Sequence, residues 1–276
     1  MANITPTTNA VFIPEVWSGE TLKATEQNLV MAKRVARYDD LVKGMGDTVH
    51  IPNVANLTAA NKTAGTALTP AANTETENTI SIDKHKAVAF LIEDITRIQS
   101  KPQLQSIYTD KAGYAIAEAV DDDLVALYAG LSTSVGTAST ALTDAVTVSA
   151  VVALDDANAP QSDRHFVIKP ATKGDILKLD KFVLHTNTGP SADGGRVLTG
   201  KLGEIYGIEV AVSTNIVVST GTRNLMFHRE AFALAMQKQP SVKADYNVLA
   251  VGTEVVVDSI YGVAELRDAF GVEVLT

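Results

Sequence analysis

Cysteine is absent from this sequence of 276 residues. Disulfide bonds, a thiolate nucleophile and cysteine-based metal sites are therefore excluded, and the composition suits a reducing compartment. Aromatic residues make up only 5% of the chain, with a single tryptophan, Trp17. No apolar run approaches the roughly 20 residues that cross a bilayer, and the first residues show neither the basic nor the apolar region of a signal peptide. We therefore expect synthesis in the cytoplasm and no contact with a membrane.

Recognisable clusters of reactive residues are also missing. Residues 195–201 match the beginning of a phosphate-binding loop, but Leu202 stands where a Ser or Thr must hold magnesium. Residues 121–123 are three consecutive aspartates in a predicted helix, so they point in different directions and predict a solvated helix face rather than a cation site. The histidines are scattered singly, without the spacing of a metal centre. They are His50, His85, His165, His185 and His228. We expect no catalytic residue, no metal ion and no cofactor.

The formal net charge of −9 argues against a protein whose main role is to grip nucleic acid, because such proteins present a basic surface. It is compatible with a container that encloses nucleic acid without binding it tightly. A simple gain in solubility explains the acidity equally well.

The first 93 residues predict extended structure that cannot bury itself. Residues 15–37 show a loose helical spacing of apolar residues, with Ser18 as the N-cap. Residues 47–54 and 76–93 are predicted as the two strands of a long hairpin, across which His50 and His85 could face each other. The hairpin tip, residues 57–74, lacks an apolar pattern. Because a lone hairpin is marginal in water, we expect it to contact another subunit, and its deletion to block assembly without unfolding the subunit.

The remaining residues predict a long helix and then mixed α/β structure. The helix begins near Pro102 and ends near Gly130, about 28 residues or roughly 42 Å long. Further predicted elements follow, with the last three forming a return to β-structure. They are a helix at 146–156, a buried strand at 165–168, a helix from Pro170, a strand at 208–212, and strands at 224–235, 246–260 and 271–275.

Seven short segments, in order along the chain, resemble a single family. They are residues 12–18 (FIPEVWS), 46–52 (GDTVHIP), 82–86 (IDKHK), 90–95 (FLIEDI), 117–121 (AEAVD), 164–170 (RHFVIKP) and 258–263 (DSIYGV). Each segment alone is weak, but their order makes the set specific. Together they resemble the major capsid proteins of tailed bacteriophages, whose subunit has the Johnson fold, also called Hong Kong 97-like.

The resemblance implies an α+β subunit that builds an icosahedral shell around double-stranded DNA and is not an enzyme. It implies an N-terminal arm (1–45), an extended loop (46–93), a peripheral domain with a spine helix (94–135), an apical domain (136–223) and returning peripheral strands (224–276). The implied partners are copies of itself in pentamers and hexamers, a scaffolding protein, a portal and a decoration protein. The expected location is the virion, after synthesis in the host bacterial cytoplasm.

Residues of the arm and of the extended loop are the candidate contacts between subunits. They are Trp17, Arg34, Arg37, His50, Lys62, Thr63, Lys84, His85 and Lys86. Two other classes stay open. One is a different shell or tube protein, such as an encapsulin or a tail-tube subunit. The other is a small-ligand enzyme with a site around residues 186–207, whose activity would depend on Lys201.

Overall fold

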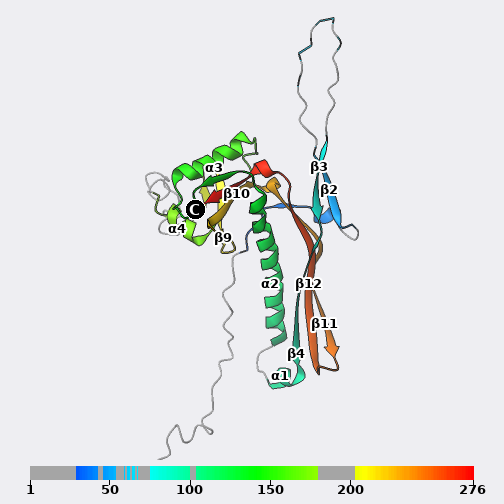
Figure 1. The fold of residues 1–276 in the computed structure, drawn as a ribbon. Helices are drawn as coiled ribbons and strands as arrows, with labels where there is room; N and C mark the ends of the chain where they lie inside the picture. Colours follow the sequence, from blue (N-terminus) through cyan, green and yellow to red (C-terminus); the bar gives the residue numbers. More distant parts are fainter. Residues whose placement is uncertain are drawn as a thin grey trace, which may run out of the picture.

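The computed structural model describes residues 29–42, 46–53, 75–99, 104–179 and 203–276, together with residues 59, 61, 62, 64, 65 and 67. These residues form a rounded part, called the head here, and a long ribbon of strands that extends from it (Figure 1). No helix among the described residues is both long and apolar enough to cross a membrane.

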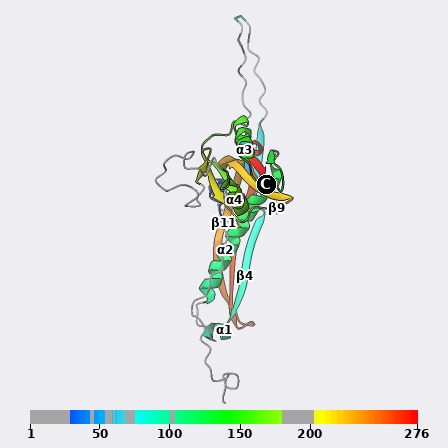
Figure 2. The same ribbon diagram turned by 90° about the vertical axis from the view of Figure 1, so that its left-hand side faces the viewer.

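The ribbon is a four-stranded sheet in the order β1 (Ala36–Arg37), β11 (Phe232–Asn247), β12 (Gly252–Glu265) and β4 (Lys84–Glu93). The helix α2 (Leu104–Val125) runs beside β4 and β12 (Figures 1 and 2). Its buried residues Ala112, Ile116, Val120 and Leu124 recur every four positions, which is the spacing of one helix face. Apolar residues on one face of β4 and β12 pack against that helix face.

The head is built on a seven-stranded sheet. Its order is β5 (Ser134–Gly136), β13 (Gly271–Leu275), β10 (Gly221–His228), β6 (Arg164–Ile168), β8 (Ile208–Val212) and β7 (Glu204–Ile205), with β9 (Val218–Ser219) paired to β10. Helices α3 (Asp144–Asp156) and α4 (Pro170–Ile176) lie against this sheet (Figure 1). In β6, Phe166, Val167 and Ile168 are all fully buried, as expected of a central strand with both faces covered. One continuous apolar core joins the head to the upper part of α2.

A separate two-stranded sheet, β2 (Thr48–Asn53) with β3 (Thr76–Ser81), stands on the other side of the ribbon. Val49 and Ile80 are paired across it and buried. They form a small core with Val42, Ala233 and Ala235. The base of the predicted hairpin is therefore held by its own subunit, whereas we expected it to need a neighbour.

The predicted second strand of the hairpin, residues 76–93, is two strands in the structure. It breaks at Ile82 and Asp83, after which β4 leaves β3 and pairs with β12. Gly262 lies against the backbone at this break, and a Cβ added to it would overlap the carbonyl oxygen of Ser81. Only glycine permits this close approach of two backbones, and the alternation of apolar residues continues through the break without revealing it.

Two further elements differ from prediction. Residues 29–35 form a turn followed by β1, and not the end of a helix over 15–37, because backbone N–H groups of this segment bond to a side chain of α2. The predicted strand 224–235 is interrupted by a short 3-10 helix, Arg229–Ala231, where the chain passes from the head sheet to the ribbon. The Nδ1 atom of His228 accepts the backbone N–H of Glu230 and stabilises this corner.

Several other elements agree with the sequence. Helix α2 continues through a 3-10 turn, Ala126–Gly130, so that the predicted length is confirmed. The predicted helix 146–156 and the strands at 165–168 and 208–212 are also confirmed. Strand β10 crosses residue 223, the predicted boundary between the apical domain and the returning strands. Strands β10 and β13 pair with each other in the head sheet. The division into arm, loop, peripheral and apical domains stays a prediction.

Candidate subunit-contact residues

Seven of the nine predicted contact residues lie within the described part of the chain, and Trp17 and Thr63 lie outside it. Inside the subunit, four of them form ion pairs, and His50 and His85 each lie beside a carboxylate with which they pair when the ring is protonated. Lys62 is exposed. The pairs are Arg34–Glu209 (2.5 Å), Arg37–Asp39 (2.7 Å), His50–Glu77 (3.2 Å), Lys84–Asp123 (3.7 Å), His85–Asp258 (3.3 Å) and Lys86–Asp123 (3.6 Å). The structure therefore gives these charges a role within the subunit, and their proposed role between subunits stays a prediction.

His50 and His85 do not face each other. His50 is paired with Thr79 in the β2–β3 sheet, whereas His85 is paired with Ile260 in the ribbon. Each ring lies beside a carboxylate of its own sheet, Glu77 or Asp258. The histidine pair that the sequence left open is not formed, because β4 does not continue the hairpin.

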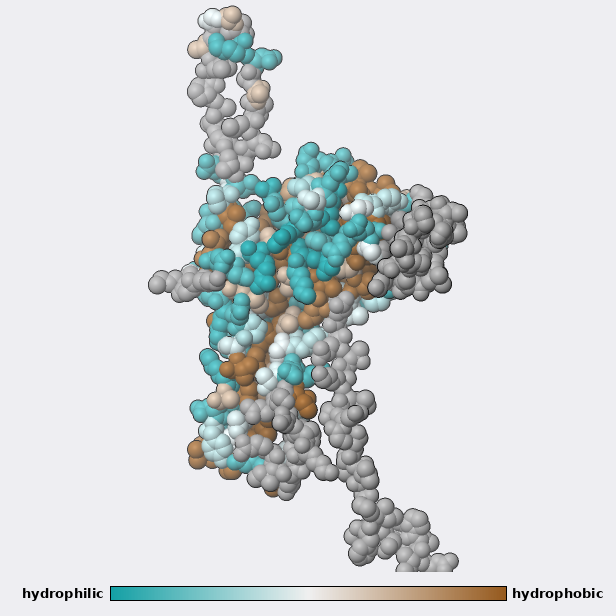
Figure 3. All heavy atoms as spheres, turned by 180° about the vertical axis from the view of Figure 1, so that it is seen from behind, coloured by the Kyte–Doolittle hydropathy of each residue, from teal (hydrophilic) through white to brown (hydrophobic). Residues whose placement is uncertain are grey.

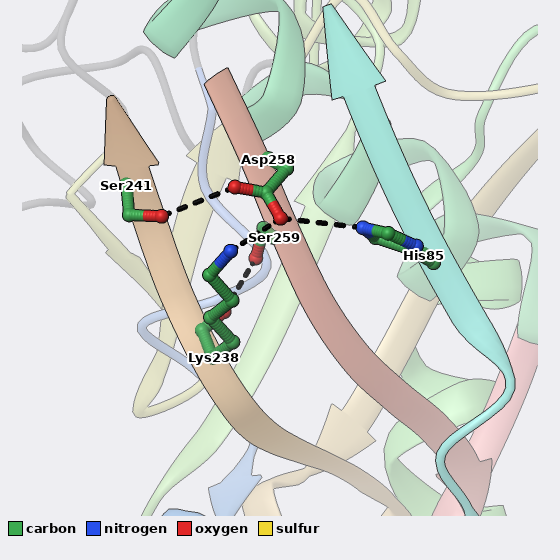
Figure 4. A network of polar contacts seen from close by, with 5 residues as sticks. All are labelled: His85, Lys238, Ser241, Asp258 and Ser259. Carbon is green, nitrogen blue, oxygen red and sulfur yellow. Dashed lines mark hydrogen bonds and ion pairs between the residues drawn. The ribbon is translucent and has the colours of Figure 1, made fainter. Parts of the chain in front are cut away.

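Asp258 is the centre of a polar network on the face of the ribbon opposite α2 (Figure 4). Lys238 forms an ion pair with its Oδ2 atom, and His85 lies 3.3 Å from the same oxygen. The hydroxyl of Ser241 donates to Oδ1 at 3.1 Å. The hydrogen bond from Lys238 lowers the pKa of Asp258 to about 2, with smaller contributions from His85 and Ser241. The network crosses three strands and stabilises their register where β11 is irregular.

A second carboxylate, Asp123, joins α2 to the ribbon. Its Oδ2 atom accepts the phenolic O–H of Tyr261 at 2.7 Å, and Lys84 and Lys86 lie within ion-pair distance. Tyr261 is fully buried, and this burial together with Asp123 raises the pKa of its hydroxyl. The hydroxyl therefore stays a donor, and it fixes how α2 sits on β12.

At the edge of the head, Arg34 and His165 share one carboxylate, Glu209. Arg34 donates to one oxygen at 2.5 Å, and Nδ1 of His165 lies 3.0 Å from the other. The hydrogen bond from Arg34 is the main reason why the pKa of Glu209 is lowered. Burial lowers the pKa of His165 against the opposing influence of Glu209. This contact connects the turn at residues 30–35 to strand β8.

The three consecutive aspartates separate as the helical geometry requires, but only Asp122 is exposed. Asp121 is buried and accepts the backbone N–H groups of Val30 and Met31. The prediction of a solvated helix face is therefore wrong for Asp121. Its place one residue after buried Val120 and four before buried Val125 was the available signal, because both neighbours lie on the apolar side of the helix.

Among the described residues, no group of three or more acidic and histidine side chains could hold a metal ion. The phosphate-loop match at residues 195–201 and most of the candidate enzyme segment lie outside the described residues.

Apolar side chains gather at the end of the ribbon far from the head, called the distal end here. In this region β4 ends, α1 (Asp94–Gln99) begins, and β11 turns into β12 (Figure 1). Figure 3 shows hydrophobic side chains along the ribbon and at this end. The exposed residues are Leu91, Ile95, Tyr108, Tyr246, Val248, Leu249 and Val251. Phe90 and Tyr108 pack their rings at 5.6 Å beside a groove of about 400 Å³.

The turn between β11 and β12 presents apolar side chains on a backbone that is hydrogen-bonded to Asn247. The Oδ1 atom of Asn247 accepts the N–H groups of Leu249 and Ala250, at 3.0 and 3.1 Å. Leu249 is 98% exposed, and Val251 has a φ of +47°, which is strained for a β-branched residue. A strained turn with an exposed leucine is typical of a segment shaped for binding rather than for the stability of its own subunit.

A family model described as phage capsid protein matches residues 74–273, well over half of the chain. The chain belongs to the phage capsid protein family. No curated protein matches its sequence.

Solved structures of phage capsids resemble this capsid protein over nearly its whole length. A chain from Mycobacterium phage Che8 is 26% identical, with a TM-score of 0.83 over 95% of this chain and 97% of the other. A chain of the cyanophage P-SCSP1u capsid is 19% identical, with a TM-score of 0.78 over 99% of both. A chain of the mature bacteriophage PhiM1 capsid is 13% identical, with a TM-score of 0.76 over 95% and 91%. The last two likenesses concern the fold alone.

The capsid protein therefore has the α+β Johnson fold and is the major subunit of an icosahedral shell. The apolar turn at Asn247–Gly252 was not predicted from the sequence, because residues 246–260 were expected to form one strand. Four apolar residues in succession after Asn247 were the available signal of an exposed contact.

Proposed function

We propose that this capsid protein closes its shell through apolar contacts at the distal end of the ribbon, and that the shell encloses double-stranded DNA. The observation that carries this proposal is the exposed, strained turn that includes Leu249 and Val251. A monomer gains nothing from exposing a leucine almost completely, whereas a neighbouring subunit that covers it gains apolar burial of about 25 cal/mol per Å². Repeated over a symmetric shell, many such small contacts close the assembly.

The domain roles follow from this placement. The ribbon with α2 is the peripheral domain, the head is the apical domain, and the β2–β3 sheet begins the extended loop. Residues 1–45 are the arm that reaches a neighbour. A scaffolding protein, a portal and a decoration protein complete the assembly in the host cytoplasm, and the finished subunit resides in the virion and has a purely structural role.

The test compares two equally drastic changes in exposed apolar residues. Leu249→Asp should leave the melting temperature within about 2 °C of the wild type, because surface substitutions usually change stability by less than about 0.5 kcal/mol. It should nevertheless prevent shells, measured by light scattering and negative-stain microscopy under conditions in which the wild type assembles. Val218→Asp on β9, a residue 56% exposed on the head, is the matched control and should assemble. Normal shells from folded Leu249→Asp would contradict the proposed contact.

The cargo is tested separately on purified particles. Nuclease-protected DNA inside them supports a genome container. Particles filled with protein and without DNA would instead support the encapsulin alternative.

A further inference from the structure

Of the three consecutive aspartates at residues 121–123, only Asp121 is buried, with 1% of its surface exposed. It lies near the head end of α2, beside the first described residues of the chain. Its Oδ1 atom accepts the backbone N–H of Met31 at 2.7 Å and that of Val30 at 3.1 Å. Its Oδ2 atom lies 3.4 Å from the side-chain nitrogen of Asn215.

A carboxylate in this place is costly. Burial raises the pKa of Asp121, and only the backbone N–H groups that it accepts oppose this effect. An apolar residue would satisfy the surrounding core without that cost, because the adjacent helix positions Val120, Leu124 and Val125 are all buried and apolar. The stability of α2 therefore does not explain the aspartate. What it provides is a pair of directional bonds to two consecutive peptide groups.

Those two bonds hold the backbone at Val30 and Met31. Val30, Met31 and Val35 are buried in the main core, and apolar burial alone would hold them without fixing the direction of the backbone. Two N–H groups aimed at one oxygen restrict the backbone dihedrals of both residues, because hydrogen bonds are directional. Arg34 adds a bond from its guanidinium to the carbonyl of Val30 at 3.0 Å and connects the same turn to Glu209.

We propose that Asp121 is the positioning residue that fixes the place and direction of the backbone at Val30 and Met31, within the predicted N-terminal arm (1–45). The arm reaches its neighbour from a site set by the spine helix α2, so any tilt of α2 within the shell moves the base of the arm with it. This inference rests on the proposed role of the arm in contacts between subunits, but its main readout does not.

The experiment uses the full-length subunit and three variants. Asp121→Ala removes both acceptor oxygens, and Asp122→Ala is the matched control one residue away on the exposed side. Asp121→Asn is the conservative rescue, since its amide oxygen still accepts the two N–H groups. Asn215 can serve that rescue by turning its amide, because its Oδ1 atom is buried without a hydrogen-bond partner and would accept the new N–H group.

The first readout is amide hydrogen exchange in the unassembled subunit. Asp121→Ala should accelerate exchange at Val30 and Met31 by about ten- to hundredfold, while the amide of Leu225 in the head sheet keeps its rate. Asp121→Asn should restore most of the protection, and Asp122→Ala should match the wild type. The second readout is shell formation, which Asp121→Ala should reduce or misdirect and which both other variants should retain.

Unchanged exchange at Val30 and Met31 in Asp121→Ala would overturn the proposal, and so would accelerated exchange together with normal shells. If Asp121→Ala does not yield folded protein, the wild type decides the matter. In the wild type, the amides of Val30 and Met31 should then exchange as slowly as the amide of Leu225. Exchange at Val30 and Met31 that is at least about a hundredfold faster than at Leu225 would refute a fixed anchor. Because exchange is measured without a shell, a failure here is distinguishable from failure of the contact at the distal end.

Discussion

The head and the ribbon of this capsid protein differ in how the faces of their sheets are covered. In the head, strands β6 and β10 have apolar residues on both faces, and α3 and α4 help to close the sheet against a continuous core. In the ribbon, α2 covers one face of β4 and β12, and the opposite face carries the Asp258 network and exposed small residues. The head sheet is covered by apolar packing, whereas one face of the ribbon is left uncovered.

The difference shows where assembly takes place. An uncovered sheet face and an apolar distal end are liabilities in an isolated protein, because they invite association. In a shell subunit the same features are useful, since neighbours cover them. The ribbon retains its own shape through polar contacts, which hold strands in register without requiring a second apolar layer.

The largest expected effect is a contrast between two phenylalanines. Phe166→Ala in the fully buried strand β6 should lower the free energy of unfolding by about 3–5 kcal/mol, because it leaves a cavity in the head. Phe90→Ala in the half-buried ribbon should cost only about 1–2 kcal/mol, through partial loss of apolar burial and of the Tyr108 ring contact. Denaturant unfolding of both variants measures the difference. Equal losses would show that the ribbon is as self-contained as the head.

A smaller effect is expected from the charge at the centre of the ribbon. Asp258→Asn should lower the melting temperature at pH 7, because it removes a carboxylate whose pKa is lowered to about 2 by Lys238, His85 and Ser241. A lowered pKa stabilises the folded state above the unfolded value of about 3.9, and this stabilisation is lost as the pH falls toward 2. The difference in melting temperature between wild type and variant should therefore shrink between about pH 4 and pH 2.

The control for this pH dependence is Lys238→Met, which removes the main cause of the lowered pKa while Asp258 remains. In this variant, the stabilisation by the Asp258 carboxylate should be lost over a narrower pH range than in the wild type. A difference between wild type and Asp258→Asn that stays constant from pH 7 to pH 2 would show that the carboxylate does not titrate as its surroundings predict.

The smallest effect is expected on the hairpin. His50 and Glu77 are both more than half exposed, so His50→Gln should change the free energy of unfolding by less than about 0.5 kcal/mol. Val49, the residue before His50, is buried and packs with Ile80 in the small core. Val49→Ala should therefore lower the free energy of unfolding clearly more than His50→Gln does. Thermal unfolding of the two variants side by side provides the measurement. A large loss from His50→Gln alone would mean that the hairpin depends on its charges and not on its buried base.

The sequence pattern was sufficient to predict an element wherever the apolar residues of one segment indicate which of its faces is buried. Helices α2 and α3 were predicted because their apolar residues repeat at the helical period, and β6 was predicted because its apolar residues form a short continuous run. The order of the seven short segments also led to the correct family. The break at Ile82 escaped prediction because the same period-two spacing is found on both sides of it, and Gly262, which lies against the break, is far away in the sequence. The break at Arg229 coincides with the polar run His228–Glu230, which was an available signal.

The candidate contact residues show the same limit more sharply. A basic residue such as Lys84 or His85 can be recognised in the sequence as charged and placed on a strand. Its partner cannot, because Asp258 lies 173 positions from His85 and becomes its neighbour only once β12 pairs with β4. The periods of the helices and strands, the absence of a thiol and the family resemblance were thus properties of the sequence alone. Which carboxylate is buried, which charge is paired and which apolar turn is exposed were decided by the tertiary structure, since each depends on strand order, and no local run of residues encodes strand order.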